Sequence, residues 1–291
     1  MTPSPHFLNI PAEAARNPKA PFAVLPVPYE RTVSYGTGTA LGPSAILTAS
    51  HETEDFDEEL QVPVNVEVQT LPPVKLARLD EKEAMTAIKT AALPVMRAGR
   101  FLLSLGGEHS ISAPLISAAR EAFGPLSVLH IDAHLDLRDK YRGTSLSHAC
   151  VMRRVRETGT PTVHVAIRSC SAEEAIYVKH LKIPVFWAKD ICLKSDDISW
   201  INKVIGQLGR KVYLSIDIDG LDPSFVPGTG TPEPGGLSWH QITSLVSRVV
   251  SKRNVVAADI VETAPIKGSQ VSEFVAARLG LKILLHKQLR R

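Results

Sequence analysis

The chain has 291 residues, of which 44% are hydrophobic and 22% are charged, and its formal net charge is +3. These values are typical of a globular protein with a large core. The small net charge and the lack of a dense basic tract argue against a nucleic-acid partner, and no apolar run approaches the ~20 residues that a membrane span requires.

Apolar runs of strand length recur along the chain and do not alternate polar with apolar residues. Strands that are buried on both faces have this pattern, and they belong to parallel sheets covered by helices. In chain order the runs are residues 22–27, 101–105, 126–131, 162–167, 183–187, 212–216 and 255–261.

Helical patterns lie between most of these runs, and capping residues support two of the helix starts. Ser171 with Glu174, and Ser238 with Gln241, have the spacing of a capping box, in which both side chains satisfy free backbone N–H groups. The predicted helices are residues 112–123, 148–157, 172–180, 197–208, 239–251 and 271–287. The alternation of strands and helices predicts an α/β fold, a three-layer α/β/α arrangement with a mainly parallel central sheet of about eight strands.

The chain shows no internal repeat, low-complexity segment or convincing linker. We therefore expect residues 1–20 to form an irregular N-terminal arm and residues 21–291 to form a single catalytic domain. Residues 1–17 lack the charged start and long apolar stretch of a signal peptide. The three cysteines, at long spacings, form neither a disulfide framework nor a CxxC metal site. These features predict a soluble, cytoplasmic protein.

The most informative residues follow two of the apolar runs. Asp132, His134 and Asp136 come after the third run, and Asp217 and Asp219 come after the sixth. In an extended chain, side chains two residues apart point to the same side, so each set can converge on one point. Clustered carboxylates without nearby cations repel one another, and metal ions are the usual means of keeping them ionised.

Further polar residues follow other runs. His109 comes shortly after the second run, His148 opens a predicted helix, and Glu262 follows the last run. Because the carboxyl ends of parallel strands open on one edge of a sheet, these residues can meet the two carboxylate sets there. The Pro- and Gly-rich residues 222–236 follow the sixth run, and they form either a pocket wall or a crossover loop without a ligand role.

The ligand types decide the class of metal. Carboxylates and imidazoles without thiolates favour Mn²⁺, Fe²⁺, Co²⁺ or Zn²⁺ over a structural, Cys-rich zinc site. The candidates are too many for one tetrahedral ion, and they suit two ions about 3.5–4 Å apart that share bridging carboxylates. Such a pair lowers the pKa of a bound water toward neutrality, so the predicted reaction is hydrolysis. The metal-ligand candidates are His109, Asp132, His134, Asp136, Asp217 and Asp219.

Some polar residues have simpler interpretations. An isolated Asp-x-Asp pair, or a lone His after two glycines, is usually structural, and the joint occurrence at several strand ends is what favours a metal site. Asp259 lies within the last run and is interpreted as a paired structural residue. We interpret four other histidines as core or surface residues without ligand-like neighbours, namely His130, His164, His180 and His240.

Together these segments resemble the ureohydrolase family, the arginases and agmatinases. The matching segments are residues 106–110 (GGEHS), 132–136 (DAHLD), 215–223 (SIDIDGLDP) and 227–237 (PGTGTPEPGGL). The resemblance covers nearly the whole chain. It implies an arginase-like fold, two Mn²⁺ ions per chain, and hydrolysis of a guanidino compound to urea and an amine by a metal-bridging hydroxide.

The resemblance also implies roles for individual residues. Asp132 and Asp217 would bridge the two ions. His148 matches the proton-transfer histidine of the family, and Glu262 matches the carboxylate that faces the guanidinium. Asp136 and His148 would help to protonate the leaving amine. The remaining ligands would be His109 and Asp136 at one ion, and His134 and Asp219 at the other.

Within the family, residues 132–154 look like those of agmatinases, which favours agmatine as the substrate and urea and putrescine as the products. Arg138 stands where arginases place an Asn that binds the amino-acid end of the substrate. Arg138 could attract a carboxylate, as in guanidinobutyrate, whereas Asp139 could cancel this charge. Residues 263–265 (TAP) replace the more usual Val-Asn-Pro or Val-Ser-Pro near the pocket, which leaves the identity of the substrate open.

Other interpretations stay open beside agmatine. Guanidinobutyrate, arginine and free guanidine are alternative substrates. A deacetylase-like amide hydrolase would use one Zn²⁺ and adjacent histidines, but no His-His pair occurs in the chain. A catalytically silent relative is the third class, and the full set of ligand candidates argues against it.

Glu108 replaces the Asp that is more usual in the family, and we expect this change to affect the support of His109. The resemblance also suggests a homotrimer or homohexamer.

Overall fold

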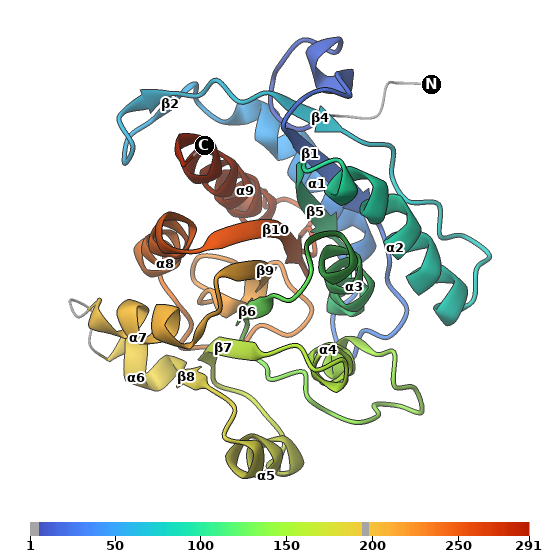
Figure 1. Cartoon of the computed structure of the whole chain (residues 1–291), viewed down its shortest axis with the longest axis vertical. Helices are drawn as coiled ribbons and strands as arrows, with labels where there is room; N and C mark the ends of the chain where they lie inside the picture. Colours follow the sequence, from blue (N-terminus) through green and yellow to red (C-terminus); the bar gives the residue numbers. More distant parts are fainter. Residues whose placement is uncertain (1–5, 194–197, 291) are drawn as a thin grey trace.

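The computed structural model describes residues 6–193 and 198–290. Its centre is a sheet of eight parallel strands in the order β4-β1-β5-β10-β9-β6-β7-β8 (Figure 1). The strands are β1 (Phe22–Val27), β4 (Val68–Thr70), β5 (Phe101–Gly106), β6 (Ser127–Ile131), β7 (Thr162–Ile167), β8 (Val185–Trp187), β9 (Lys211–Asp217) and β10 (Asn254–Val261). The predicted α/β/α fold with a parallel sheet is confirmed.

Each apolar run singled out in the sequence forms a strand of this sheet, and β4 is the strand that the sequence did not predict. β4 has three residues at the sheet edge, too short for an apolar run to stand out. A separate antiparallel pair, β2 (Phe56–Asp57) with β3 (Val62–Pro63), was also not predicted.

The helices agree with the prediction where a clear apolar pattern exists. They are α1 (Gly42–Ala49), α2 (Glu81–Arg97), α3 (Ser112–Phe123), α4 (Val151–Glu157), α5 (Ala172–Leu181), α6 (Ala188–Cys192), α7 (Ser199–Gln207), α8 (Trp239–Lys252) and α9 (Val271–Leu289). The expected start of α7 at Asp197 lies outside the described residues. Both predicted capping boxes are present, at Ser171 and at Ser238.

Of the helices that the sequence did not predict, α2 carried a readable signal. Asp80 caps its N-terminus and forms a capping box with Glu83. Its buried residues recur at intervals of four, from Ala84 through Ile88 and Ala92 to Met96, as in a helix with one face in the core.

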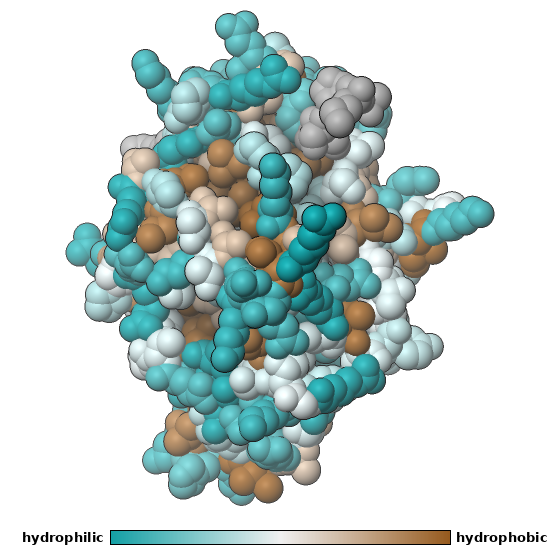
Figure 2. Space-filling model, turned by 90° about the vertical axis from the view of Figure 1, so that its right-hand side faces the viewer, coloured by the Kyte–Doolittle hydropathy of each residue, from teal (hydrophilic) through white to brown (hydrophobic). Residues whose placement is uncertain are grey.

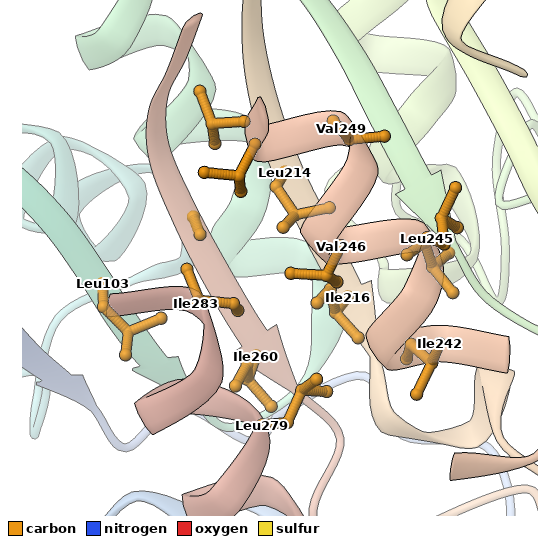
Figure 3. Packing of buried hydrophobic residues seen from close by; sticks show 14 of the residues in the cluster. Leu103, Leu214, Ile216, Ile242, Leu245, Val246, Val249, Ile260, Leu279 and Ile283 are labelled. Carbon is orange, nitrogen blue, oxygen red and sulfur yellow. The ribbon is translucent and has the colours of Figure 1, made fainter. Parts of the chain in front are cut away.

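The helices cover the sheet in two layers. Buried residues of α1, α7, α8 and α9 belong to one core cluster, and those of α2, α3, α4 and α5 belong to the other. Figure 1 shows α8 and α9 on one side of the sheet and α2, α3 and α4 on the other. In the first layer, Val246 of α8 and Ile283 of α9 pack against Leu214 of β9 and Ile260 of β10 (Figure 3).

The outer surface in Figure 2 is mostly hydrophilic, with apolar areas between long polar side chains. This is the expected result for helices that bury one stripe and expose the other. Among residues 6–193 and 198–290, no helix has the length and apolar character needed to cross a membrane.

The N-terminal arm is anchored in its described part. Phe7 and Leu8 are buried, and a short 3-10 helix, η1 (Ala14–Arg16), precedes β1. The division of the chain into an arm of residues 1–20 and a catalytic domain of residues 21–291 stays a prediction.

A buried lysine fastens the β2–β3 pair to α9. Nζ of Lys282 lies 2.8 Å from Oδ2 of Asp57 and 3.1 Å from Oε2 of Glu59, and the side chains of Lys282 and Asp57 are 1% and 0% exposed. Burial by itself raises the pKa of Asp57, but hydrogen bonds from Lys282 and from the Leu60 N–H outweigh it and hold this pKa below its usual range. The Asp57 carboxylate is therefore stabilised in its charged form.

We expect Lys282→Met to lower the free energy of unfolding by about 3–5 kcal/mol, because it removes the direct ion-pair partner of a buried carboxylate. Thermal or urea unfolding measures the change. A matched control, Lys252→Met at an exposed position of α8, is expected to stay within about 0.5 kcal/mol of the wild type. Because the pKa of Asp57 is lowered in the folded state, its ionised form stabilises the fold at pH values above its unfolded-state pKa. The difference in unfolding free energy between the wild type and Lys282→Met should therefore shrink as the pH falls through the acid range. A loss of under about 1 kcal/mol at neutral pH contradicts this account.

Candidate metal centre

The candidate site lies at the carboxyl edge of the four central strands. β5, β10, β9 and β6 are adjacent and parallel, so the residues that follow them meet at one edge. His109 opens a 3-10 turn after β5, Glu262 follows β10, Asp217 ends β9, and Asp132 follows β6. All four are buried. The structure therefore brings together segments that are up to 153 residues apart in the chain.

The first cluster surrounds His109. Its Nδ1 lies 3.0 Å from Oδ2 of Asp132, 3.2 Å from Oδ2 of Asp136 and 3.3 Å from Oδ2 of Asp217. Although three carboxylates are this close, the buried Nδ1 makes no well-aligned hydrogen bond within the described part of the chain. A ring nitrogen aimed into a ring of carboxylates without a hydrogen bond is the arrangement that a divalent cation would complete.

The second cluster surrounds His134. Its Nδ1 lies 3.1 Å from Oδ2 of Asp219 and 3.4 Å from Oδ1 of Asp132. Asp132 thus turns one oxygen toward each cluster. Asp217 contacts His109 through Oδ2, and its Oδ1 accepts the backbone N–H of Asp219. Within the described residues, two adjoining groups of possible ligands contain all the predicted ligands except Asp217, which instead contacts His109 of the first group.

Repulsion among the carboxylates is strong. Burial, followed by the nearby Asp219 and Asp132 carboxylates, raises the pKa of Asp217 well above its usual range. Burial and Asp132 likewise raise the pKa of Asp136. Cations are needed to keep such groups ionised together. The donor set of imidazoles and carboxylates therefore fits a pair of divalent ions.

Two of the acidic residues have left-handed backbone conformations. The φ angle is 54° at Asp136 and 63° at Glu262, values that are uncommon for non-glycine residues. The carbonyl of Asp136 accepts the N–H groups of Met152 and Arg153, which fixes the loop. The Glu262 N–H donates to Gly107, so β10 and β5 stay joined at this point.

Glu262 occupies the floor of the site without belonging to either cluster. Its Oε1 accepts the backbone N–H of His109 at 2.6 Å. Burial, then the Glu108 carboxylate, raises the pKa of Glu262 well above its usual range. A cationic substrate group beside Glu262 would lower this pKa again.

His148 forms another part of the wall of the site. Its Nδ1 lies 3.1 Å from Oγ1 of Thr32, and its backbone N–H donates to the same oxygen at 3.0 Å. The Tyr141 ring meets the imidazole edge-on, with the ring centroids 5.8 Å apart. His148 belongs to neither group of possible metal ligands among the described residues.

A cavity of about 240 Å³ opens between these walls. His134, Asp136, His148 and Glu262 all line it, as do Gly230 and Thr231 of the Pro- and Gly-rich residues 222–236. These residues therefore form part of a pocket wall, the first of the two interpretations offered for them.

Some predictions about the surroundings need correction. The four histidines outside the ligand set were expected to have no ligand-like neighbours, but Nε2 of His130 lies 2.9 Å from Oδ2 of Asp132. Glu108 was expected to support His109; its carboxylate instead accepts from Arg31, Thr32 and Ser110.

The His109 imidazole is supported from another strand. Its Nε2 lies 3.0 Å from Oγ of Ser215, which donates to Asp259 at 2.8 Å. Tyr213 donates to the same carboxylate. Asp259 is thus the paired structural residue that was predicted. Ser215 was not predicted, although its position two residues before Asp217 on β9 places it on the same side of the strand.

The charge of Arg138 is balanced by Glu174, and not by Asp139 as the sequence suggested. Asp139 pairs with Arg154 at 2.9 Å, away from Arg138. Nε of Arg138 lies 3.8 Å from Oε2 of Glu174, and its guanidinium lies 5.2 Å from the centre of the Tyr141 ring. Glu174 was predicted only as a helix cap, and its other oxygen accepts the Leu137 N–H, close to the ligands.

The sequence model of the Arginase family matches residues 20–286. The chain belongs to the arginase family. It is 41% identical to the N(1)-aminopropylagmatine ureohydrolase of Synechocystis over 91% of this chain and 88% of that protein. It is 35% identical to the agmatinase of Bacillus anthracis, covering 89% of each.

Solved structures agree with this placement in the arginase family. The agmatine ureohydrolase of Thermoplasma volcanium superposes with a TM-score of 0.82 at 28% identity, covering 94% of this chain and 93% of that one. The proclavaminate amidino hydrolase of Streptomyces clavuligerus, at 24% identity, shares the fold with a TM-score of 0.88 over 99% of this chain and 98% of that one. The protein is thus a metal-dependent ureohydrolase that acts on guanidino C–N bonds and has a buried His/Asp metal site. This assignment argues against the deacetylase-like alternative.

Proposed function

We propose that the protein hydrolyses a guanidinobutyl amine, either agmatine or its N1-aminopropyl derivative, to urea and the corresponding amine, with two Mn²⁺ ions bound. The observation that carries the proposal is the pair of adjoining His/Asp groups that share Asp132. Agmatine is the substrate that the sequence motifs favour. The 41% identity to an N(1)-aminopropylagmatine ureohydrolase supports the second substrate.

The proposed ligand sets follow the two clusters. Asp132 would bridge, since its two oxygens face His109 and His134. Asp217, whose Oδ2 faces His109, would be the second bridge, as the family resemblance implies. When bound, the two ions would supply a water of lowered pKa for attack on the guanidinium carbon. The other ligands would be His109 and Asp136 at one position, and His134 and Asp219 at the other.

The remaining residues would bind the substrate and move protons. Glu262 would pair with the planar guanidinium, because it is a buried carboxylate on the floor of the cavity that does not belong to the ligand set. His148, which also lines the cavity, would exchange protons with solvent and with the departing amine. Asp136, a ligand that also lines the cavity, would help to protonate the amine.

The cavity favours a cationic tail over an anionic one. Arg138 is the cation that could bind a substrate carboxylate, but its guanidinium already lies near the Glu174 carboxylate and the Tyr141 ring. Glu174 lies beside Arg138 in the cavity lining and offsets its positive charge. An ammonium tail therefore suits this charge pattern better than the carboxylate of guanidinobutyrate.

Parallel assays of urea release with Mn²⁺-loaded enzyme test the substrate. We expect agmatine and N1-aminopropylagmatine to exceed guanidinobutyrate, arginine and free guanidine in kcat/KM by at least about tenfold, or about 1.4 kcal/mol of discrimination. We also expect the aminopropyl compound to exceed agmatine. If guanidinobutyrate or arginine is the best substrate, the proposal for the tail is wrong, while the metal chemistry stands.

Two further properties stay predictions. The family resemblance suggests a homotrimer or homohexamer, which sedimentation velocity can measure. A cytoplasmic location was predicted from the cysteines and the N-terminal residues.

A further inference from the structure

A buried polar row lies directly beneath the candidate metal centre. His130 on β6 and His164 on β7 are register partners, and both are fully buried. Asp132 comes two residues after His130, and Thr162 comes two residues before His164. Because side chains two residues apart lie on one face, these four can form a continuous row along and across two neighbouring strands.

The distances show that the row is connected from end to end. Nε2 of His130 lies 2.9 Å from Oδ2 of Asp132, and Nδ1 of His130 lies 2.9 Å from Nδ1 of His164. Nε2 of His164 lies 2.8 Å from Oγ1 of Thr162. That oxygen also accepts a hydrogen bond from a guanidinium nitrogen of Arg156 at 3.1 Å. The chain of contacts therefore joins Arg156 to the carboxylate shared by the two clusters.

The contacts permit one consistent direction of donation for a neutral His130. The Asp132 carboxylate only accepts, so Nε2 of His130 must carry the hydrogen, and Nδ1 of His130 must then accept from His164. His164 in turn accepts from the Thr162 hydroxyl, whose oxygen is left to accept from Arg156. Burial lowers the pKa of His164 well below its usual range, which agrees with a neutral ring. Hydrogen bonds aligned in this way strengthen one another.

We propose that His130 and His164 are positioning residues that hold Asp132 in its bridging orientation, and that His130 is not itself a metal ligand. This inference rests on the proposed metal site. His130 is close enough to be grouped with His109, Asp132 and Asp136 as a possible ligand. However, both of its ring nitrogens already have partners, one in Asp132 and one in His164. Release of Asp132 would be required before Nε2 could coordinate.

Both carboxylate oxygens of Asp132 have protein partners, and the buried polar row, called the relay from here on, supplies one of them. Oδ1 accepts the backbone N–H of His134 at 2.5 Å, and Oδ2 faces His130. Each oxygen thus has a protein partner of its own. A carboxylate held at both oxygens cannot rotate about its terminal bond without breaking a hydrogen bond, so it is pre-oriented toward both clusters.

Two variants of nearly equal size at position 164 test the proposal. Asn can place its amide N–H where Nδ1 of His164 lies, whereas Leu cannot donate. We expect His164→Leu to weaken Mn²⁺ binding by about 10–100-fold in calorimetric titration, and His164→Asn to stay within about threefold of the wild type. We also expect the electron paramagnetic resonance signal of a coupled Mn²⁺ pair in the wild type and in the Asn variant, with reduced coupling in the Leu variant. The melting temperatures of the two metal-free variants measure the effect of each change on stability, separately from its effect on Mn²⁺ binding.

The outcomes separate this inference from the proposed function. If wild-type protein binds no Mn²⁺ pair, the proposed metal site fails. If the wild type binds the pair and His164→Leu binds it within threefold of the wild-type affinity, the relay is overturned. Equal losses in the Leu and Asn variants would also overturn it. Should the Leu variant fail to fold, Thr162→Val removes the next donor at almost unchanged volume. We expect this variant to weaken binding by about threefold or more, and unchanged affinity would again contradict the relay.

Discussion

Asp132→Ala is expected to remove nearly all activity, to below about one thousandth of the wild-type kcat/KM, and to remove both metal ions. Asp132 faces His109 through one oxygen and His134 through the other, so its loss opens both proposed coordination spheres at once. Without the ions, the pKa of the attacking water rises from near neutrality to that of bulk water, so hydroxide is scarce at neutral pH. Metal content after Mn²⁺ loading and urea release are the two measurements.

A second carboxylate provides the control for Asp132→Ala. Asp139 lies in the same loop, but its side chain is 55% exposed and pairs with Arg154. Asp139→Ala should keep two ions per chain and close to the wild-type rate. Chelation of the wild type should abolish activity, and Mn²⁺ should restore it. A fully active protein that holds a single ion per chain, or an Asp132→Ala variant that keeps both, would falsify the dinuclear assignment.

His148→Ala is expected to lower kcat by about 10²–10⁴-fold while the protein keeps its metal and its fold. His148 lines the cavity and is held by Thr32, but it belongs to neither ligand group in the described chain. Removal of its imidazole therefore takes away a proton carrier and leaves the coordination intact. Urea release, Mn²⁺ content and melting temperature measure the three properties separately.

Added imidazole gives an independent readout for His148→Ala. The vacated space should admit the free base, and we expect partial recovery of the rate that saturates with imidazole concentration. His148→Asn can still hydrogen bond to Thr32, so it tests whether that contact alone supports the rate. Loss of metal in His148→Ala would make His148 a ligand. A wild-type rate would make it structural.

The local pattern of the sequence was enough to predict the central strands and the edge of the sheet at which the candidate metal ligands meet. Runs such as residues 126–131 are apolar on both faces, which only a covered parallel sheet accommodates. The period of two in an extended chain then predicts that Asp132, His134 and Asp136 share a side. The edge at which they meet Asp217 follows from parallel strand direction alone. The strand prediction and the shared edge hold, but the period of two does not explain the convergence. The chain after β6 is not extended, since Asp136 has a left-handed backbone, and Asp219 lies in a 3-10 helix after β9. The turns that follow the strands bring these side chains together.

The sequence alone did not predict which side chains of different strands contact one another. That His130 meets His164, and that Ser215 meets His109, depends on which strands are adjacent and on their register. Strand order in this sheet does not follow chain order, since β10 lies between β5 and β9. The pairing of Arg138 with Glu174 instead of Asp139 has the same origin, because α5 brings Glu174 in from a distant segment. Periodicity specifies which way a side chain points, whereas only the packed sheet specifies what it meets.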